Sequence, residues 1–201
     1  MADNQRITGG EIVQSRALKT RIKIIEEALK LYAKKGYYNT TVDEIAKSAS
    51  LSVGTAYRYF KDKKELLLAA LTYGFSNINE LAYVSVTDVF GADLERVMVN
   101  FEKIHMDYFN LHEELEGLRH TDEDVRRLYD NFLESALKDI HDNLPKEIRE
   151  RDNSFHDLRI AFGIIENHCH NYMHGNLDEE TITYMRKRTV EVVELILKGT
   201  V

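Results

Sequence analysis

Two short helical patterns, at residues 41–48 and 52–60, are separated by a break of only three residues. Both repeat apolar residues at three- and four-residue steps, as amphipathic helices do. The second pattern opens at Ser52, a residue type favoured at helix N-caps. Helices this short bury too little apolar surface to be stable alone. They need a third helix, and the amphipathic residues 18–35 supply it.

The second short pattern would present a polar and aromatic face to solvent. Hydroxyl and guanidinium groups suit contacts with phosphate oxygens and base edges. Two short helices joined by a tight turn form a helix-turn-helix, whose second helix lies in the DNA major groove. The alternative is a three-helix core whose aromatic residues only pack. The residues of this face are Ser52, Thr55, Tyr57, Arg58 and Tyr59.

The net charge of −7 looks unfavourable for a DNA-binding protein, but the charges are unevenly distributed. Residues 1–74 carry 13 Lys and Arg against 8 Asp and Glu, whereas residues 75–201 carry 14 against 26. All eight His lie in the second part. An asymmetry of this kind indicates that the N-terminal part meets a polyanion.

Composition excludes several classes of protein. The single cysteine, Cys169, rules out an internal disulfide, and the first residues show no signal-peptide pattern, so we expect a cytoplasmic location. The longest apolar run, residues 66–71, is too short to span a bilayer, and we expect no membrane partner. No glycine-rich phosphate loop, nucleophile elbow or HExxH motif occurs, so we expect no enzyme, no catalytic residue and no cofactor.

The pattern of the whole chain predicts an all-α fold with two domains. We expect a flexible arm over residues 1–17, a helix-turn-helix DNA-binding domain over 18–62, and a C-terminal helical bundle over 63–201 for ligand binding and dimerisation. The polar residues 143–153 hold the only proline and predict a loop. The helices expected after residue 61 cover residues 62–84, 92–112, 122–142, 154–174 and 178–198.

The last helix is apolar over most of its circumference, which is typical of a helix buried on two sides. One side can pack on its own chain, and the other needs a further partner. We therefore expect a homodimer formed through the last two helices, about 154–174 and 178–198. Dimers also suit helix-turn-helix proteins, because two half-sites one turn apart multiply affinity.

About 50 residues, roughly 18–68, closely resemble the signature of the tetracycline-repressor (TetR) family. That family has nine- or ten-helix chains of about 200 residues, and the present length and helix count are similar. Over the second domain the resemblance covers architecture alone. The matching positions are Gly36-Tyr37, Thr40-Thr41-Val42, Ile45-Ala46, Leu51-Ser52, Gly54-Thr55, Tyr57-Arg58-Tyr59-Phe60, Lys63 and Leu66.

The resemblance implies a DNA-binding role for nine residues. Hydroxyl and amino groups would meet phosphate or sugar, and the low surface near Gly54 would let the helix backbone approach the groove. The contacts that the resemblance implies with the DNA sugar-phosphate backbone come from Thr41, Ser52, Tyr57, Tyr59 and Lys63. Implied contacts to base edges come from Val53, Gly54 and Thr55, with Arg58 on the same exposed face.

Two positions depart from the family pattern. Ser50 stands in the inter-helix turn where the family usually has glycine, so either Ser50 is left-handed, at about 1–2 kcal/mol, or the turn differs. Ala56 stands where the family usually has a larger aliphatic residue, which thins the packing beneath the second short helix. Neither change removes a group that would face DNA.

Regulators of this family are typically controlled by a small ligand held among the middle helices. The candidate lining here is aromatic, so we expect an apolar or aromatic effector of unknown identity. The alternative is that these residues are ordinary core, because they lie at helical spacing on inward faces. The candidates are Phe101, His105, Tyr108, Phe109, Tyr129, Phe132 and Phe162.

Glu166, His170 and His174 share one helical stripe at steps of four residues. A His pair at this spacing suits zinc, copper or nickel, whereas Cys169 points about 100° away. We assign no metal site and keep a metal-dependent sensor or enzyme on this stripe as an alternative. A second alternative is a helical interaction protein that does not bind DNA.

The sequence therefore predicts a ligand-responsive transcriptional regulator that binds double-stranded DNA. We expect a repressor, released from a palindromic operator by its effector.

Overall fold

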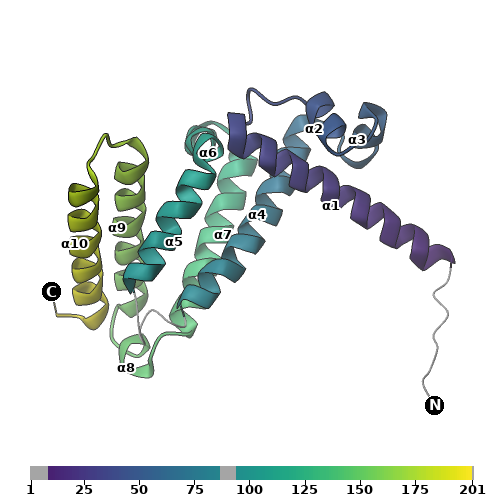
Figure 1. The fold of residues 1–201 in the computed structure, drawn as a ribbon. Coiled ribbons are helices and arrows are strands. Elements are labelled where there is room, and N and C mark those ends of the chain that lie inside the picture. The colour runs from purple at the N-terminus through teal and green to yellow at the C-terminus, as the bar shows by residue number, and fades with distance from the viewer. Residues whose placement is uncertain (1–8, 87–93, 201) are drawn as a thin grey trace, which may run out of the picture. The chain divides into compact units, whose positions relative to one another are not determined.

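The computed structural model describes residues 9–86 and 94–200, with side chains described for 15–77 and 94–200. The described residues form ten helices and no strand, so the predicted all-α fold is confirmed (Figure 1). None of these helices combines the length and apolar character needed to cross a bilayer. The chain divides into two compact units, Met1–Gly74 and Phe75–Val201.

The first unit is built on a long helix, α1 (Gly9–Lys35). The short helix α2 (Val42–Ser48) packs on α1, and α3 (Val53–Tyr59) packs on α2. α4 (Lys63–Val86) begins in this unit. Gly36 follows α1 at φ +83°, the left-handed position that a glycine after a helix end favours. The fully buried large side chains of this unit are Tyr32, Ile24, Ile45, Leu66, Leu67 and Thr40.

The predicted flexible arm over residues 1–17 is wrong for residues 9–17, because α1 begins at Gly9. Residues 9–17 include the good helix formers Glu11, Gln14, Arg16 and Ala17, and adding turns to an existing helix is far easier than nucleating one. Arg16 in this extension accepts a hydrogen bond at its carbonyl oxygen from the Thr20 hydroxyl at 2.9 Å. Residues 1–8 of the predicted arm lie outside the described residues.

The first unit extends to Gly74, beyond the boundary predicted at residue 62. The first turns of α4 belong to its core, since Leu66, Leu67 and Ala70 are buried. Tyr73 also donates a hydrogen bond to the Glu26 carboxylate on α1 at 2.8 Å. Assigning one unit to DNA binding and the other to ligand binding stays a prediction.

The second unit is a bundle in which α9 packs beside α10, α5 and α7, and α6 packs beside α7 (Figure 1). Its core includes Leu94, Val97, Met98, Leu137, Leu158, Ala161, Ile165, Cys169, Val193 and Leu197. Its helices after α4 are α5 (Leu94–Asp107), α6 (Phe109–Thr121), α7 (Glu123–Asp142), α8 (Lys146–Arg149), α9 (Ser154–His174) and α10 (Glu179–Lys198).

The single helix predicted over residues 92–112 is wrong, because the chain breaks at Tyr108 between α5 and α6. Tyr108 has φ −114° and ψ 19°, outside the α region. Its N–H still donates to the Ile104 carbonyl at 3.1 Å, and its own carbonyl accepts from the His112 N–H at 2.8 Å. The break therefore leaves few backbone groups unpaired. The predicted loop at 143–153 also contains one short helix, α8.

A buried ion network joins three helices of the second unit. The Glu102 side chain on α5 is 3% exposed and accepts two hydrogen bonds from Arg186 on α10, at 2.8 and 2.7 Å. His168 on α9 lies 2.7 Å from the same carboxylate. Burial opposes the charged form, but the bonds from His168 and Arg186 outweigh it and lower the pKa of Glu102. The network fixes how α5, α9 and α10 align.

We predict that Glu102→Ala destabilises the protein by about 3 kcal/mol, because it leaves the Arg186 charge half-buried without its carboxylate. Urea unfolding followed by circular dichroism measures the loss. The control is Glu123→Ala, which removes an exposed ion pair with Arg127 and is expected to change stability by less than about 1 kcal/mol. Equal losses in the two variants would contradict the prediction.

Candidate functional site

Helix α2 is fixed at its start by a capping box. The Thr41 hydroxyl accepts a hydrogen bond from the Glu44 N–H at 3.2 Å, and the Glu44 carboxylate accepts one from the Thr41 N–H at 2.9 Å. Lys35 also contacts Glu44 at 2.6 Å, and Lys35 and then Thr41 lower the pKa of Glu44 to about 2. Thr41 is exposed and has a structural role in the capping box, and its predicted contact with the DNA backbone stays a prediction.

Helix α3 is capped by Ser52, whose hydroxyl accepts a hydrogen bond from the Thr55 N–H at 3.2 Å and lies 2.8 Å from the Thr55 hydroxyl. All seven residues of α3 are described, and Ala56 alone is buried. Tyr57 is 51% exposed. The exposed residues on α3 are Gly54, Tyr57 and Arg58, and the half-buried ones are Val53, Thr55 and Tyr59.

Lys63, at the start of α4, lies beside two aromatic rings. Its ammonium is 4.2 Å from the centre of the Tyr37 ring and donates to the Tyr38 carbonyl at 3.3 Å. Tyr38 is 63% exposed, and its ring packs edge-on against Tyr37. Tyr38 was not predicted as a site residue.

The turn between α2 and α3 contains a left-handed serine. Ser50 has φ +57°, which confirms the first of the two possibilities given above. A side chain at this φ costs about 1–2 kcal/mol relative to the right-handed conformation. The strained turn sets the direction in which α3 leaves α2.

We predict that Ser50→Gly raises the stability of the protein by about 0.5–1 kcal/mol, the relieved strain less the greater freedom of glycine in the unfolded chain. Thermal unfolding measures the change. Ser50→Ala keeps the Cβ atom and is the matched control, for which no gain is expected. A gain of the same size with alanine would show that strain at Cβ is not the cause.

In the second unit, the aromatic residues predicted to line a ligand site form separate ring pairs. Phe101 and Phe162 meet edge-on at 6.5 Å between ring centres, and Tyr129 and Phe132 at 6.5 Å. Phe75 of α4, which was not predicted, stacks on Phe132 at 4.2 Å. Burial raises the pKa of Tyr129 to about 12, and the Arg119 guanidinium lies 3.7 Å from the centre of its ring.

Two other members of the predicted lining lie near the break between α5 and α6. Phe109 contacts the His174 ring at 5.5 Å, and Tyr108 is the half-buried residue at the break itself. A wide hollow of about 780 Å³ lies elsewhere, at the start of α10, and is lined by Asp178, Glu179, Glu180, Thr183, Tyr184 and Lys187. The aromatic ligand site stays a prediction.

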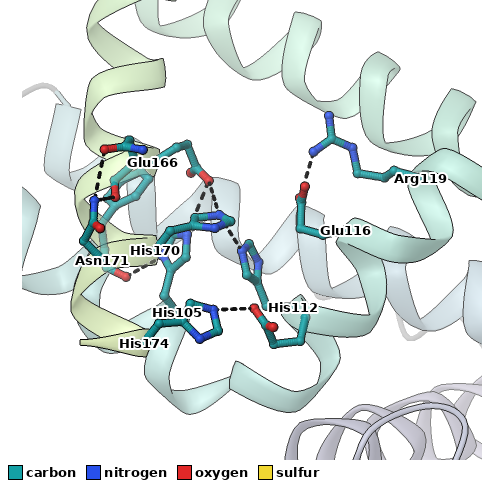
Figure 2. A network of polar contacts seen from close by, with 11 residues as sticks. His105, His112, Glu116, Arg119, Glu166, His170, Asn171 and His174 are labelled. Atoms are coloured by element: carbon teal, nitrogen blue, oxygen red, sulfur yellow. Dashed lines mark hydrogen bonds and ion pairs between the residues drawn. The ribbon is translucent and has the colours of Figure 1, made fainter. Parts of the chain in front are cut away.

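His105 belongs to a polar cluster that spans three helices. His105 on α5, His112 on α6, and Glu166 and His170 on α9 direct their side chains toward one another (Figure 2). His105 Nε2 lies 3.4 Å from Glu166 Oε2, and His112 Nε2 lies 3.0 Å from His170 Nε2. Of the predicted stripe, Glu166 and His170 belong to this cluster. His174 does not, because it pairs with Glu113 at 2.8 Å.

Burial and neighbouring charges shift the pKa values of His105 and His112 in opposite directions. Burial, aided by the nearby His105, lowers the pKa of His112 to about 4. Burial also opposes charge on His105, but its contacts with Cys169 and Glu166 outweigh this and raise its pKa to about 10. The same His105 contact lowers the pKa of Glu166 despite burial. The cluster thus holds an ion pair beside a neutral imidazole.

Known proteins resemble this chain in sequence mainly over the first unit. Residues 24–70 match the model for bacterial regulatory proteins of the tetR family. An uncharacterized HTH-type transcriptional regulator of Bacillus subtilis, YuxN, is 56% identical over 50 residues, which are 25% of this chain and 17% of YuxN. The chain spans less than a third of the length of the curated relatives that it matches.

Solved structures match almost the whole chain at low identity. A candidate TetR-family transcriptional regulator from Mesorhizobium loti superposes with a TM-score of 0.72 and 18% identity, covering 90% of this chain and 96% of that one. The multidrug binding protein EbrR, complexed with proflavin, gives a TM-score of 0.64 at 17% identity, covering 88% and 99%. Similarity at this level of identity shows a shared fold.

Proposed function

We propose that this chain is a DNA-binding transcriptional repressor whose N-terminal domain belongs to the tetR family of bacterial regulatory proteins, a proposal that the match over residues 24–70 supports. The observation that carries the proposal is the outward presentation of α3. Ala56 anchors the helix, while Tyr57 and Arg58 are exposed. The cationic excess of residues 1–74 favours approach to a duplex.

The proposed contacts follow from the position of each group on the first unit. Thr55 and Gly54 would lie against base edges, since α3 would enter the major groove. The caps at Thr41 and Ser52 and the ammonium of Lys63 would meet phosphates. Helix N-termini favour phosphate oxygens because their first N–H groups have no partner within the helix.

We propose that the active form is a homodimer built through α9 and α10. Three large apolar side chains on these helices remain exposed in a single chain: Ile160 at 56%, Tyr184 at 65% and Leu195 at 48%. Burying them against a second copy is favourable at about 25 cal/mol per Å². Two recognition helices held about 34 Å apart would then read a palindromic operator.

We propose that an apolar or aromatic effector binds in the second unit and releases DNA. EbrR, which shares the fold, was solved with the aromatic compound proflavin. Helix α4 begins in the first unit at Lys63 and continues into the second, where Phe75 stacks on Phe132. A ligand that displaces this stack would move a helix common to both units. It must bind the released state more tightly, or the equilibrium does not shift.

We predict that Arg58→Ala weakens binding to a mixed-sequence DNA duplex by about tenfold and lowers the salt dependence by about one phosphate contact. The stability of the fold stays unchanged, because Arg58 is exposed. Fluorescence anisotropy at several salt concentrations measures both quantities. The control, Lys138→Ala, removes the same charge from an exposed site on α7 and should leave affinity unchanged. The absence of salt-dependent duplex binding by the unmodified protein would instead favour a helical interaction protein that does not bind DNA.

We predict that Leu195→Glu converts the dimer to a monomer, because a buried, unpaired carboxylate is strongly disfavoured at an apolar interface. Light scattering after size exclusion should give the 23.4 kDa of one chain. Lys138→Glu, on α7, is the control and should remain a dimer. A dimer that survives Leu195→Glu would place the interface elsewhere.

A further inference from the structure

We infer that His105, His112, Glu166 and His170 form a binding site for a divalent transition metal of the zinc class. The site comprises two ligands from α9 and one each from α5 and α6 (Figure 2). It lies within the second unit. The inference does not depend on DNA binding, because metal binding is measured without a duplex.

The donor atoms already lie close to the separations that a metal requires. Zinc–ligand bonds of 2.0–2.1 Å at tetrahedral angles place neighbouring donors about 3.3 Å apart. His105 Nε2 and Glu166 Oε2 are 3.4 Å apart, His112 Nε2 and His170 Nε2 are 3.0 Å apart, and His170 Nε2 and Glu166 Oε2 are 4.0 Å apart. The donors of His105, His112 and Glu166 all lie within 4.8 Å of one another. The proposed four-ligand site requires side-chain rotations that bring His170 Nε2 to the group formed by the other three donors.

The ring of His105 is oriented as a metal ligand usually is. Its Nδ1 lies 2.8 Å from the Phe101 carbonyl oxygen, to which it donates, so Nε2 is the nitrogen that faces the cluster. A metal-ligating histidine almost always donates its other N–H to a carbonyl or carboxylate in this way. The bond to the backbone of α5 fixes the ring before any ion arrives.

The helical arrangement explains how four ligands from distant parts of the chain meet. Glu166 and His170 lie one turn apart on α9 and share a face. His105 and His112 lie on either side of the break at Tyr108, which turns α6 away from the axis of α5. The break therefore brings two histidines of successive helices to one carboxylate.

The chemistry of the donors selects the metal. Three imidazole nitrogens and one carboxylate oxygen suit zinc, nickel or copper, whereas magnesium and calcium prefer all-oxygen sites. His112 and His170 offer imidazole nitrogens and Glu166 offers a carboxylate, and a metal bound at His105 Nε2 would replace the proton that this nitrogen shares with Glu166. The His170 side chain is 34% exposed, so the cluster has an open side through which an ion can enter.

The test uses the full-length protein, freed of metal with a chelator and then titrated with Zn²⁺ against a competing chromogenic chelator. We expect one tightly bound equivalent of zinc. Both His112→Gln and His170→Gln should lower the affinity by at least about tenfold, since even changes behind the ligands cost 10- to 100-fold. Circular dichroism of each variant confirms that it is folded.

His174→Gln is the matched control, because His174 lies one turn after His170 on α9 but pairs with Glu113. Its zinc affinity should equal that of the unmodified protein. X-ray absorption of the zinc complex should show four nitrogen or oxygen neighbours near 2.0–2.1 Å. The inference is overturned by the absence of stoichiometric binding, by an equal loss in all three variants, or by a zinc–sulfur distance near 2.3 Å, which would implicate Cys169.

Discussion

The packing of two seven-residue helices onto α1 and the first turns of α4 is the constraint on which the first unit depends. Neither α2 nor α3 is long enough to persist alone, so their order comes from the buried side chains around them. Ile45 and Ala46 on α2 and Ala56 on α3 are fully buried against this core. The polar ends of both helices are closed by the hydroxyls of Thr41 and Ser52. Local caps and distant packing thus hold α3 rigid while leaving its outer surface available.

The second unit is aligned by polar contacts, since its interior contains two partly or fully buried carboxylates. Glu102 and Glu166 each receive partners from other helices, and each has its pKa lowered by them despite burial. Such groups are expensive to leave unpaired, so they reject alternative alignments of α5, α6, α9 and α10. A purely apolar interface between these helices would tolerate sliding by one turn far more readily.

Local patterns predicted much of the first unit. The periodicity of residues 41–60 predicted both short helices, and the family comparison identified Ser50 as the residue in a turn that favours glycine. The structure confirms its left-handed conformation. Exposure of Tyr57 and Arg58 also follows from a helix with one buried position. These features depend on residues within a few positions of one another, which is the range over which sequence spacing is informative.

The polar cluster could not be predicted in the same way. His105 and Glu166 are 61 residues apart, and their contact depends on the break at Tyr108, where the apolar pattern continues without glycine or proline. The stripe of Glu166, His170 and His174 was visible in the sequence, but helical spacing could not show that His174 has its own partner in Glu113. Packing between helices decided both outcomes.

The single buried position on α3 has an evolutionary consequence. Because Tyr57 and Arg58 are exposed on α3, their side chains can be exchanged with little effect on the folding free energy. In the proposed DNA-binding role, preference for a new nucleotide sequence can therefore arise by single substitutions, without a compensating change elsewhere. A scaffold of this kind suits gene duplication, since each copy can acquire its own target while keeping the same interior.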